Sequence, residues 1–398
     1  MAAQKSSIDI RYPYKLFFYD CIWEDDRIIY AASNCNAICK TNITTGETIV
    51  IGKAHEEKEK LLFHGIYKWK EYLILPGRDA RCAINLYNLE KKEWSYININ
   101  ENKREWLDFR ETDVFEYNGY LYAFPAQLVV LKINITNKNV EYIYYPGINP
   151  NKDMKGEIIL IGNIIYIPTR HDKKIYKFDL CTEQWKIAIV NTELKGIDTL
   201  CFDGKLFWMT GIGRMICSWD EDKNVSVSYN KFPQRFNKLV NRKGEQGFWF
   251  NTSIVYGKSI YFVPCDANML IEFDIENYEA KEFFIDDEWE EKEDMRAGRF
   301  STIKYMGAKK KNNVLMMLSN KNKNLIFIDM LSKEIIKTEL KLSIREGFVK
   351  LISNTPIMYE DMMNLNSWLE YVSIFGQGYK IKSGSQEESI GGKVYSSY

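Results

Sequence analysis

The chain has 398 residues, of which 45% are hydrophobic, and its 54 basic and 54 acidic residues leave no net charge. A balanced charge argues against a general nucleic-acid or membrane-surface binder, and no apolar run approaches the roughly 20 residues of a membrane span. The eight cysteines contain no C-x-x-C pair, and the first residues lack an apolar signal segment, which together predict reduced thiols and a cytoplasmic location. The abundance of Ile, Lys, Asn and Tyr suggests an AT-rich, bacterial genome.

One pattern recurs along the chain, in which an alternation of apolar and polar residues ends in Asn or Asp. The spacings between these anchor residues are 46, 46, 45, 41, 54 and 55. The anchors are Asn42, Asn88, Asn134, Asp179, Asp220, Asp274 and Asp329. A period near 45 residues is typical of repeat architectures.

Each period contains four short runs of aromatic and β-branched residues, as in residues 112–145, and lacks helical periodicity. Asn118-Gly119, Gly162-Asn163 and Asp203-Gly204 join the first two runs in three repeats, and such pairs favour two-residue hairpin turns. The anchor side chain is suited to accept hydrogen bonds from backbone amides two residues on. The unit is therefore a four-stranded antiparallel meander, and seven such units predict an all-β, seven-bladed propeller.

The expected boundaries place the propeller at residues 1–341. The pattern changes after it, because Leu365, Trp368, Leu369, Val372 and Phe375 follow helical spacing. We therefore expect a helical appendage at 342–376 and a flexible tail at 377–398. The expected blades span about 14–52, 59–100, 106–147, 156–190, 196–233, 249–286 and 298–341.

The repeat resembles the kelch repeat over roughly residues 14–341. Tyr166, Phe178, Asp179 and Trp185 match that pattern in one repeat, and Trp94 matches it in another. The kelch glycine doublet is replaced by a proline-containing stretch, so the chain is similar to a divergent kelch-like propeller. The resemblance implies a partner-binding platform, although some such propellers are enzymes.

The links from second to third strand and from blade to blade emerge on one face of a propeller, and their varied sequences predict a binding surface. Arginine forks suit carboxylate or phosphate groups, and aromatic neighbours suit sugars or peptide side chains. The alternative is that the arginines pair with nearby acids and stay solvated. The candidate ligand-binding residues are Arg78, Arg81, Trp106, Arg110, Arg170, Arg214, Trp249 and Arg299.

Equivalent positions on the innermost strands predict a ring around the central channel, formed by Cys21, Gly65, Asp113, Glu157, Asp198 and Thr252. Clustered carboxylates would raise a pKa or recruit a cation. Alternatively, they cap strand ends. If the protein is an enzyme, the catalytic candidates are Asp113, Glu157, Asp198 and His171, the last of these as a general acid or base. Three histidines provide no His-rich metal site, and no nucleotide fingerprint is present, so we expect no metal and no cofactor.

Two functional hypotheses follow. The first is a non-catalytic platform that binds a protein, peptide or glycan on the loop face, and the second is a lyase, hydrolase or transferase with an acidic central funnel. We also expect residues 388–398 to dock on a partner or a second copy, because Ile390, Val394, Tyr395 and Tyr398 are strand formers beyond a Gly/Ser-rich spacer.

Overall fold

The computed structural model describes residues 18–32, 37–53, 63, 65–77, 83–99, 107, 109, 112–145, 155–237, 249–285, 304–319 and 324–342. The chain divides into two compact units, one of Met1–Lys15 with Ile357–Tyr398 and the other of Leu16–Pro356. Every described residue belongs to the second unit. The helix expected within 356–375 and the tail at 377–398 lie outside the described residues.

The described strands form seven antiparallel sheets of four consecutive strands each, with one further strand added to the first sheet. Blades 1 to 3 consist of β1 (Cys21–Glu24), β2 (Arg27–Ala32), β3 (Ala37–Asn42) and β4 (Glu47–Lys53); β5 (Tyr67–Trp69), β6 (Tyr72–Pro76), β7 (Ala83–Asn88) and β8 (Glu93–Asn98); and β9 (Asp113–Tyr117), β10 (Tyr120–Phe124), β11 (Val129–Asn134) and β12 (Asn139–Tyr144).

Blades 4 to 7 continue the same order along the chain. They consist of β13 (Ile159–Ile161), β14 (Ile164–Pro168), β15 (Lys174–Asp179) and β16 (Gln184–Ile189); β17 (Ile197–Phe202), β18 (Phe207–Gly211), β19 (Ile216–Asp220) and β20 (Val225–Tyr229); β21 (Phe250–Tyr256), β22 (Ser259–Pro264), β23 (Leu270–Asp274) and β24 (Glu279–Phe283); and β25 (Tyr305–Lys311), β26 (Val314–Ser319), β27 (Asn324–Asp329) and β28 (Ile335–Glu339).

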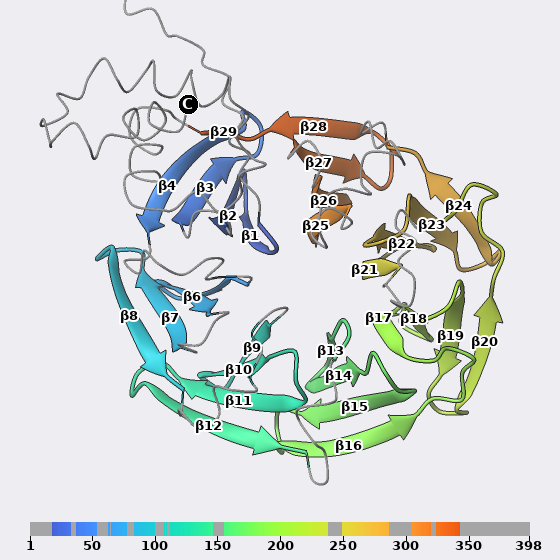
Figure 1. Cartoon of the computed structure of the whole chain (residues 1–398), viewed down its shortest axis with the longest axis horizontal. Coiled ribbons are helices and arrows are strands. Elements are labelled where there is room, and N and C mark those ends of the chain that lie inside the picture. Colours follow the sequence, from blue (N-terminus) through green and yellow to red (C-terminus); the bar gives the residue numbers. More distant parts are fainter. Residues whose placement is uncertain are drawn as a thin grey trace, which may run out of the picture. The chain divides into compact units, whose positions relative to one another are not determined.

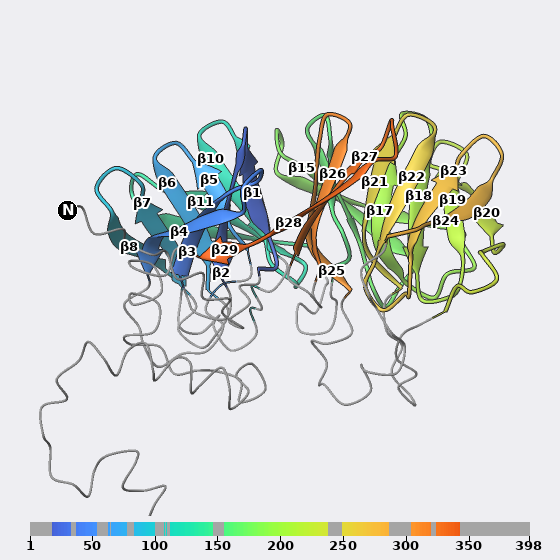
Figure 2. The same ribbon diagram turned by 90° about the horizontal axis from the view of Figure 1, so that it is seen from above.

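Figure 1 shows these sheets arranged as a ring, with the first strand of each blade nearest the axis and the fourth at the rim. The all-β, seven-bladed propeller predicted from the repeat is therefore confirmed. In the side view of Figure 2, the strands run between two faces. Alternating strand direction places the second-to-third-strand links and the blade-to-blade connections on the same face, which we call the loop face. The described part of the chain contains no helix of the length and apolarity that crossing a membrane requires.

The anchor residues share one turn geometry in all seven blades. In blade 6, for example, Asp274 Oδ1 accepts hydrogen bonds from the amides of Glu276 at 2.9 Å and Asn277 at 3.0 Å. The residue four positions after the anchor has positive φ in every blade, which allows the turn to lead into the fourth strand. The predicted role of the anchor is confirmed. Its acceptor bonds occur at Asn42, Asn88, Asn134, Asp179, Asp220, Asp274 and Asp329.

Two of the three residue pairs predicted to form two-residue hairpin turns do so between the first and second strands. Asn118 and Gly119 both have positive φ, and Gly162 begins an equally short turn. The expectation for Asp203-Gly204 was wrong, because Phe202 pairs with Phe207 and four residues connect the strands. Asp203 makes the longer turn possible, since its carboxylate accepts the amides of Lys205 and Leu206.

A recurrent tyrosine on the second strand joins neighbouring blades. Tyr122 of blade 3 donates its hydroxyl to Glu183 at 2.7 Å, and Tyr166 of blade 4 donates to Glu221 at 3.1 Å. Both acceptors lie in the anchor turn of the following blade. The tyrosine is therefore an inter-blade contact, which gives its recurrence in the sequence a physical cause.

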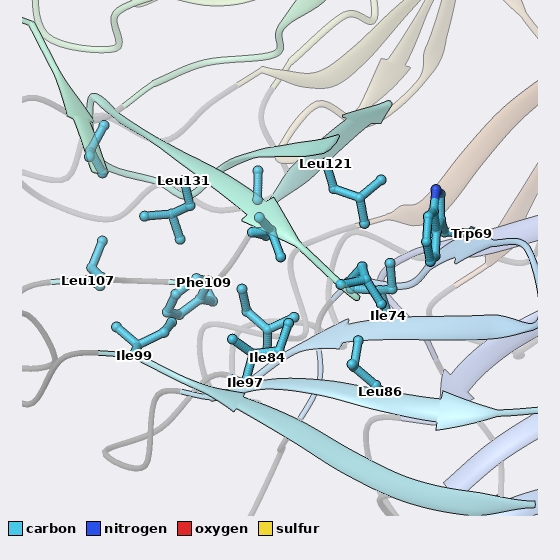
Figure 3. Close-up of a cluster of buried hydrophobic side chains, with 14 residues drawn as sticks. Trp69, Ile74, Ile84, Leu86, Ile97, Ile99, Leu107, Phe109, Leu121 and Leu131 are labelled. Carbon is cyan, nitrogen blue, oxygen red and sulfur yellow. The ribbon is translucent and has the colours of Figure 1, made fainter. Parts of the chain in front are cut away.

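The hydrophobic core is divided among the spaces between blades. Figure 3 shows the cluster between blades 2 and 3, in which Ile74, Ile84 and Leu86 face Leu121, Leu131 and Phe109. Similar clusters of buried residues join blades 1–2, 3–4, 4–5, 5–6 and 6–7. Because each blade buries both its faces only against its neighbours, stability depends on the complete ring.

In the described part of the chain, each blade takes its four strands from one continuous segment, and the ring closes between blades 7 and 1. The added strand β29 (Lys341–Leu342) pairs in parallel with β4 at the rim, through Lys341 opposite Glu47 and Leu342 opposite Thr48. Nearer the axis, Lys309 of blade 7 pairs with Asp20 at 2.7 Å. The pairing of β29 at the rim and the ion pair between Lys309 and Asp20 thus both contribute to closure.

Candidate functional site

Arg214 and Trp249, two of the predicted ligand-binding residues, both contact Phe236 on the loop face between blades 5 and 6. Arg214 lies in the exposed β18–β19 link, and its guanidinium lies 5.8 Å from the ring centroid of Phe232 and 5.4 Å from that of Phe236. Phe236 in turn stacks on Trp249, with centroids 5.0 Å apart and planes 23° apart. We call Arg214, Phe232, Phe236 and Trp249 the arginine–aromatic cluster.

Phe232 and Phe236 belong to the connection that leads from β20 towards blade 6. Their rings are 4.4 Å apart and nearly parallel, and Phe236 is 2% exposed, so it anchors the stack in the core. Trp249 is fixed through its backbone, because its carbonyl oxygen accepts the amides of Cys265 and Ala267. The cluster therefore has a rigid base and an exposed, charged upper surface.

Asn268 fixes the same connection to the β22–β23 link. Its side-chain oxygen accepts the amide of Asn237 at 2.9 Å, while its side-chain nitrogen donates to the carbonyl oxygen of Arg235 at 2.7 Å. The carbonyl oxygen of Asn268 accepts Lys304 Nζ at 2.7 Å, which connects this region to blade 7. Three blades thus hold the connection beneath Arg214.

Two of the predicted carboxylates near the axis form ion pairs between blades. Asp113 Oδ2 lies 2.6 Å from Nζ of Lys155, whose side chain is buried. Asp198 Oδ1 lies 2.7 Å from Nε of Arg170, with both side chains largely buried. Arg170, predicted as a ligand-binding residue, therefore contacts the first strand of the next blade.

The third carboxylate, Glu157, connects blade 4 to blades 5 and 6. Glu157 accepts a hydrogen bond from Thr252 Oγ1, and its Oε2 accepts Ser253 Oγ at 2.8 Å, the Ser253 amide at 3.0 Å and the Leu200 amide at 3.3 Å. Burial raises the pKa of Glu157 to about 8, although the hydrogen bonds from Thr252 and Ser253 oppose this. The cause is desolvation, and not the repulsion between clustered carboxylates that the sequence suggested.

The other predicted positions are more dispersed. His171 is exposed in the β14–β15 link, and Cys21 is buried at the start of β1, where Sγ faces the carbonyl oxygen of Gly307. Among the described residues, no group of three or more His, Cys, Asp or Glu side chains is placed to hold a metal ion. The predicted residues outside the described part of the chain are Arg78, Arg81, Trp106, Arg110 and Arg299.

Several residues that build this region were missed by the sequence analysis. Lys155, Ser253 and Phe236 carry no signature, because their importance depends on partners in other blades. Phe232 and Phe236 are spaced four residues apart in a polar link, which was the one available signal. The loop face therefore presents an exposed guanidinium over aromatic rings. Near the axis, by contrast, Asp113 and Asp198 are paired with basic side chains of the protein itself.

No protein-family model matches the sequence, and neither does any curated protein sequence. Solved structures do match the fold. One is the computationally designed protein Ika8, with 9% sequence identity, a TM-score of 0.50, and coverage of 83% of this chain and 90% of that chain. Another is the extracellular domain of a hybrid two-component system from B. thetaiotaomicron, with 14% identity, a TM-score of 0.51, and coverage of 77% of this chain and 39% of that chain.

A third similar structure is that of the mitotic checkpoint complex, with 11% identity and a TM-score of 0.52. It covers 82% of this chain and 95% of the matched chain. At such low identities the similarity shows the propeller fold alone, so function must be inferred from the residues of this chain.

Proposed function

We propose that this propeller is a non-catalytic platform that binds a protein, peptide or glycan through its loop face. The observation that carries the proposal is the exposed guanidinium of Arg214, fixed against the rings of Phe232 and Phe236. A pre-oriented cation beside aromatic surface provides charge recognition and apolar contact together, at a small entropic cost on binding.

The pairing of the axial charges supports a scaffold role. Asp113 and Asp198 bind cations of neighbouring elements, and Glu157 accepts hydrogen bonds from two other blades. These contacts hold the inner strands in place. A rigid ring that presents variable links is a common basis for binding in repeat proteins.

The finer features of the proposal come from the sequence. We infer a divergent kelch-like repeat in a cytoplasmic bacterial protein from the repeat pattern and the composition. We also infer that the helical segment after the propeller and residues 388–398 provide a second contact, with a partner or a second copy.

A capture experiment tests the platform. Immobilised full-length protein is incubated with lysate, and the retained proteins and glycans are compared between wild type and the variants Arg214→Glu and Trp249→Ala. We expect both variants to lose retained partners, while Tyr96→Ser, on the exposed rim strand β8, retains them. Equal retention by all four proteins would contradict binding at this part of the loop face.

The alternative is an enzyme with an acidic central funnel, and one observation favours it. A pKa of about 8 keeps the Glu157 carboxyl largely protonated at neutral pH, as a general acid requires. A screen of glycan and peptide substrates tests this function. If Asp113→Asn, Glu157→Gln and His171→Ala leave every detected activity unchanged, these residues are not catalytic.

A further inference from the structure

The orientation of Arg214 restricts what its guanidinium can bind. Its planar group lies against the rings of Phe232 and Phe236, at 5.8 and 5.4 Å from their centroids, while the residue is exposed. The rings cover part of the guanidinium, and the exposure of the residue leaves N–H groups available to a ligand. Among the described residues, no acidic side chain pairs with Arg214.

Three other basic groups described in this part of the loop face have partners. Arg235, in the same connection as the two phenylalanines, pairs with Glu282 at 3.0 Å. Lys304 donates to the carbonyl oxygen of Asn268, and Arg170 pairs with Asp198. Arg214 therefore differs from these three groups, because its charge lies over aromatic rings and is not paired with a described acid.

We infer that Arg214 receives the carboxylate of an acidic side chain in an extended peptide segment of the partner. This inference rests on the proposed platform function and specifies the chemistry of its ligand. The edge of a guanidinium presents two parallel N–H donors, which match the two oxygens of a carboxylate. The partly exposed rings of Phe232 and Trp249 would contact the residues beside the acid.

The geometry favours a carboxylate over a phosphate. A phosphorylated residue carries nearly two negative charges and is usually bound by several basic groups, whereas Arg170, Arg235 and Lys304 are engaged elsewhere. A peptide is favoured over a neutral glycan because hydroxyl groups do not compensate an oriented positive charge.

A peptide array tests the inference with the full-length protein. Random octapeptides are synthesised in four versions that differ at one central position, which is Glu, Gln, phosphoserine or Lys. We expect a subset of sequences to bind in the Glu version and to lose about tenfold or more in affinity in the Gln version, since a charged hydrogen bond contributes roughly 1.5–3 kcal/mol.

Three variants identify the residue responsible. Arg214→Ala should abolish the preference for Glu over Gln, and Arg214→Lys should weaken it, because lysine keeps the charge but lacks the planar fork. Arg235→Ala is the matched control, an exposed arginine of the same region whose charge is already paired, and should leave the preference unchanged.

Each remaining outcome overturns the inference. Tighter binding of the phosphoserine version would assign the site to phosphate, and equal binding of the Glu and Gln versions would remove the charge requirement. Suppose that no octapeptide binds, but the Arg214→Glu variant loses lysate partners that the wild-type protein retains. The platform function then stands, and the proposed peptide carboxylate is wrong. If both experiments are negative, the platform fails as well.

Discussion

The backbone amide of Lys341 donates a hydrogen bond to the carbonyl oxygen of Gly46 at 2.7 Å, and this contact joins the end of the propeller to its first blade. Gly46 occupies the positive-φ position of the anchor turn, where other blades carry Lys, Glu, Asn or Tyr. A Cβ at position 46 would overlap the carbonyl oxygen of Glu339. Glycine is therefore needed here by ring closure, since the same turn accepts other residues in the other blades.

Substitution of Gly46 by alanine should destabilise the protein more than the same substitution at Gly119. The two glycines have nearly equal φ values, +75° and +77°, so the conformational cost of roughly 1 kcal/mol is shared. Gly119 has open space around its Cβ position, whereas Gly46 faces Glu339. Thermal unfolding should show a clearly larger fall in Tm for Gly46→Ala, and equal shifts would mean that the β29 contact does not contribute to closure.

Glu157 should make the stability of the propeller depend on pH. Its folded pKa of about 8 exceeds the ordinary value of 4.5, so the folded protein holds this proton more tightly than the unfolded chain. The resulting stabilisation is complete below pH 4.5 and is lost as the pH rises through about 8. Glu157→Gln should flatten the profile of unfolding free energy over this range.

The slope of that profile is the quantity to compare between variants. The glutamine side chain places an N–H₂ group among the hydrogen-bond donors around position 157, which should lower the free energy of unfolding equally at every pH. Glu90→Gln, at an exposed position in an anchor turn, is the control and should keep the wild-type slope. An unchanged slope in Glu157→Gln would show that burial does not perturb this carboxyl.

Removing Asp113 and removing Lys155 from their ion pair should lower the free energy of unfolding by different amounts. Lys155 has 2% side-chain exposure and Asp113 has 45%. Asp113→Asn removes a carboxylate from a buried ammonium group and should cost about 2 kcal/mol or more. Lys155→Met should cost less, because it leaves a carboxylate that water can reach. Denaturant unfolding of both variants measures the difference, and a larger loss in Lys155→Met would reverse the assignment.

The anchor turns provide their own control. Asp274→Asn should have little effect on Tm, because Asn42, Asn88 and Asn134 accept the same backbone hydrogen bonds in blades 1 to 3. Asp274→Ala should lower the Tm, since two amides lose their acceptor. Equal effects of Asn and Ala would indicate that the side chain does not stabilise the turn.

The acid sensitivity of the same turn follows from its hydrogen bonds. Backbone donation from Asn277 lowers the pKa of Asp274, so its stabilising contribution is present above the ordinary pKa and is lost as the pH falls. Asp274→Asn should remove this part of the acid-side decrease in stability. An acid profile identical to that of the wild type would contradict the role of the carboxylate.

The repeat could be predicted from sequence because its determinants are local. Each anchor acts on amides two or three residues away, and strand alternation is visible within a few residues. The four-residue turn after Phe202 was missed because Asp203-Gly204 also suits a shorter turn. Local patterns therefore predicted the four-stranded blade and the number of blades, but not the length of every turn between strands.

The candidate site was less accessible to sequence analysis, since its contacts join distant segments. Glu157 meets Ser253 across 96 residues, and Lys155 meets Asp113 across 42. Arg214 and Trp249 were singled out for their chemistry, but the ring that connects them, Phe236, was not. Closure through Lys341 and Gly46 is equally non-local.

Hydrogen exchange on the protein with and without a captured partner tests the central claim most directly. Binding through the loop face predicts added protection in 212–215, 231–237 and 265–269, the segments that form and support the arginine–aromatic cluster. The opposite turns at 118–119, 162–163 and 257–258 should exchange as in the free protein. Protection confined to those turns or to the rim strands would contradict the loop face as the binding surface.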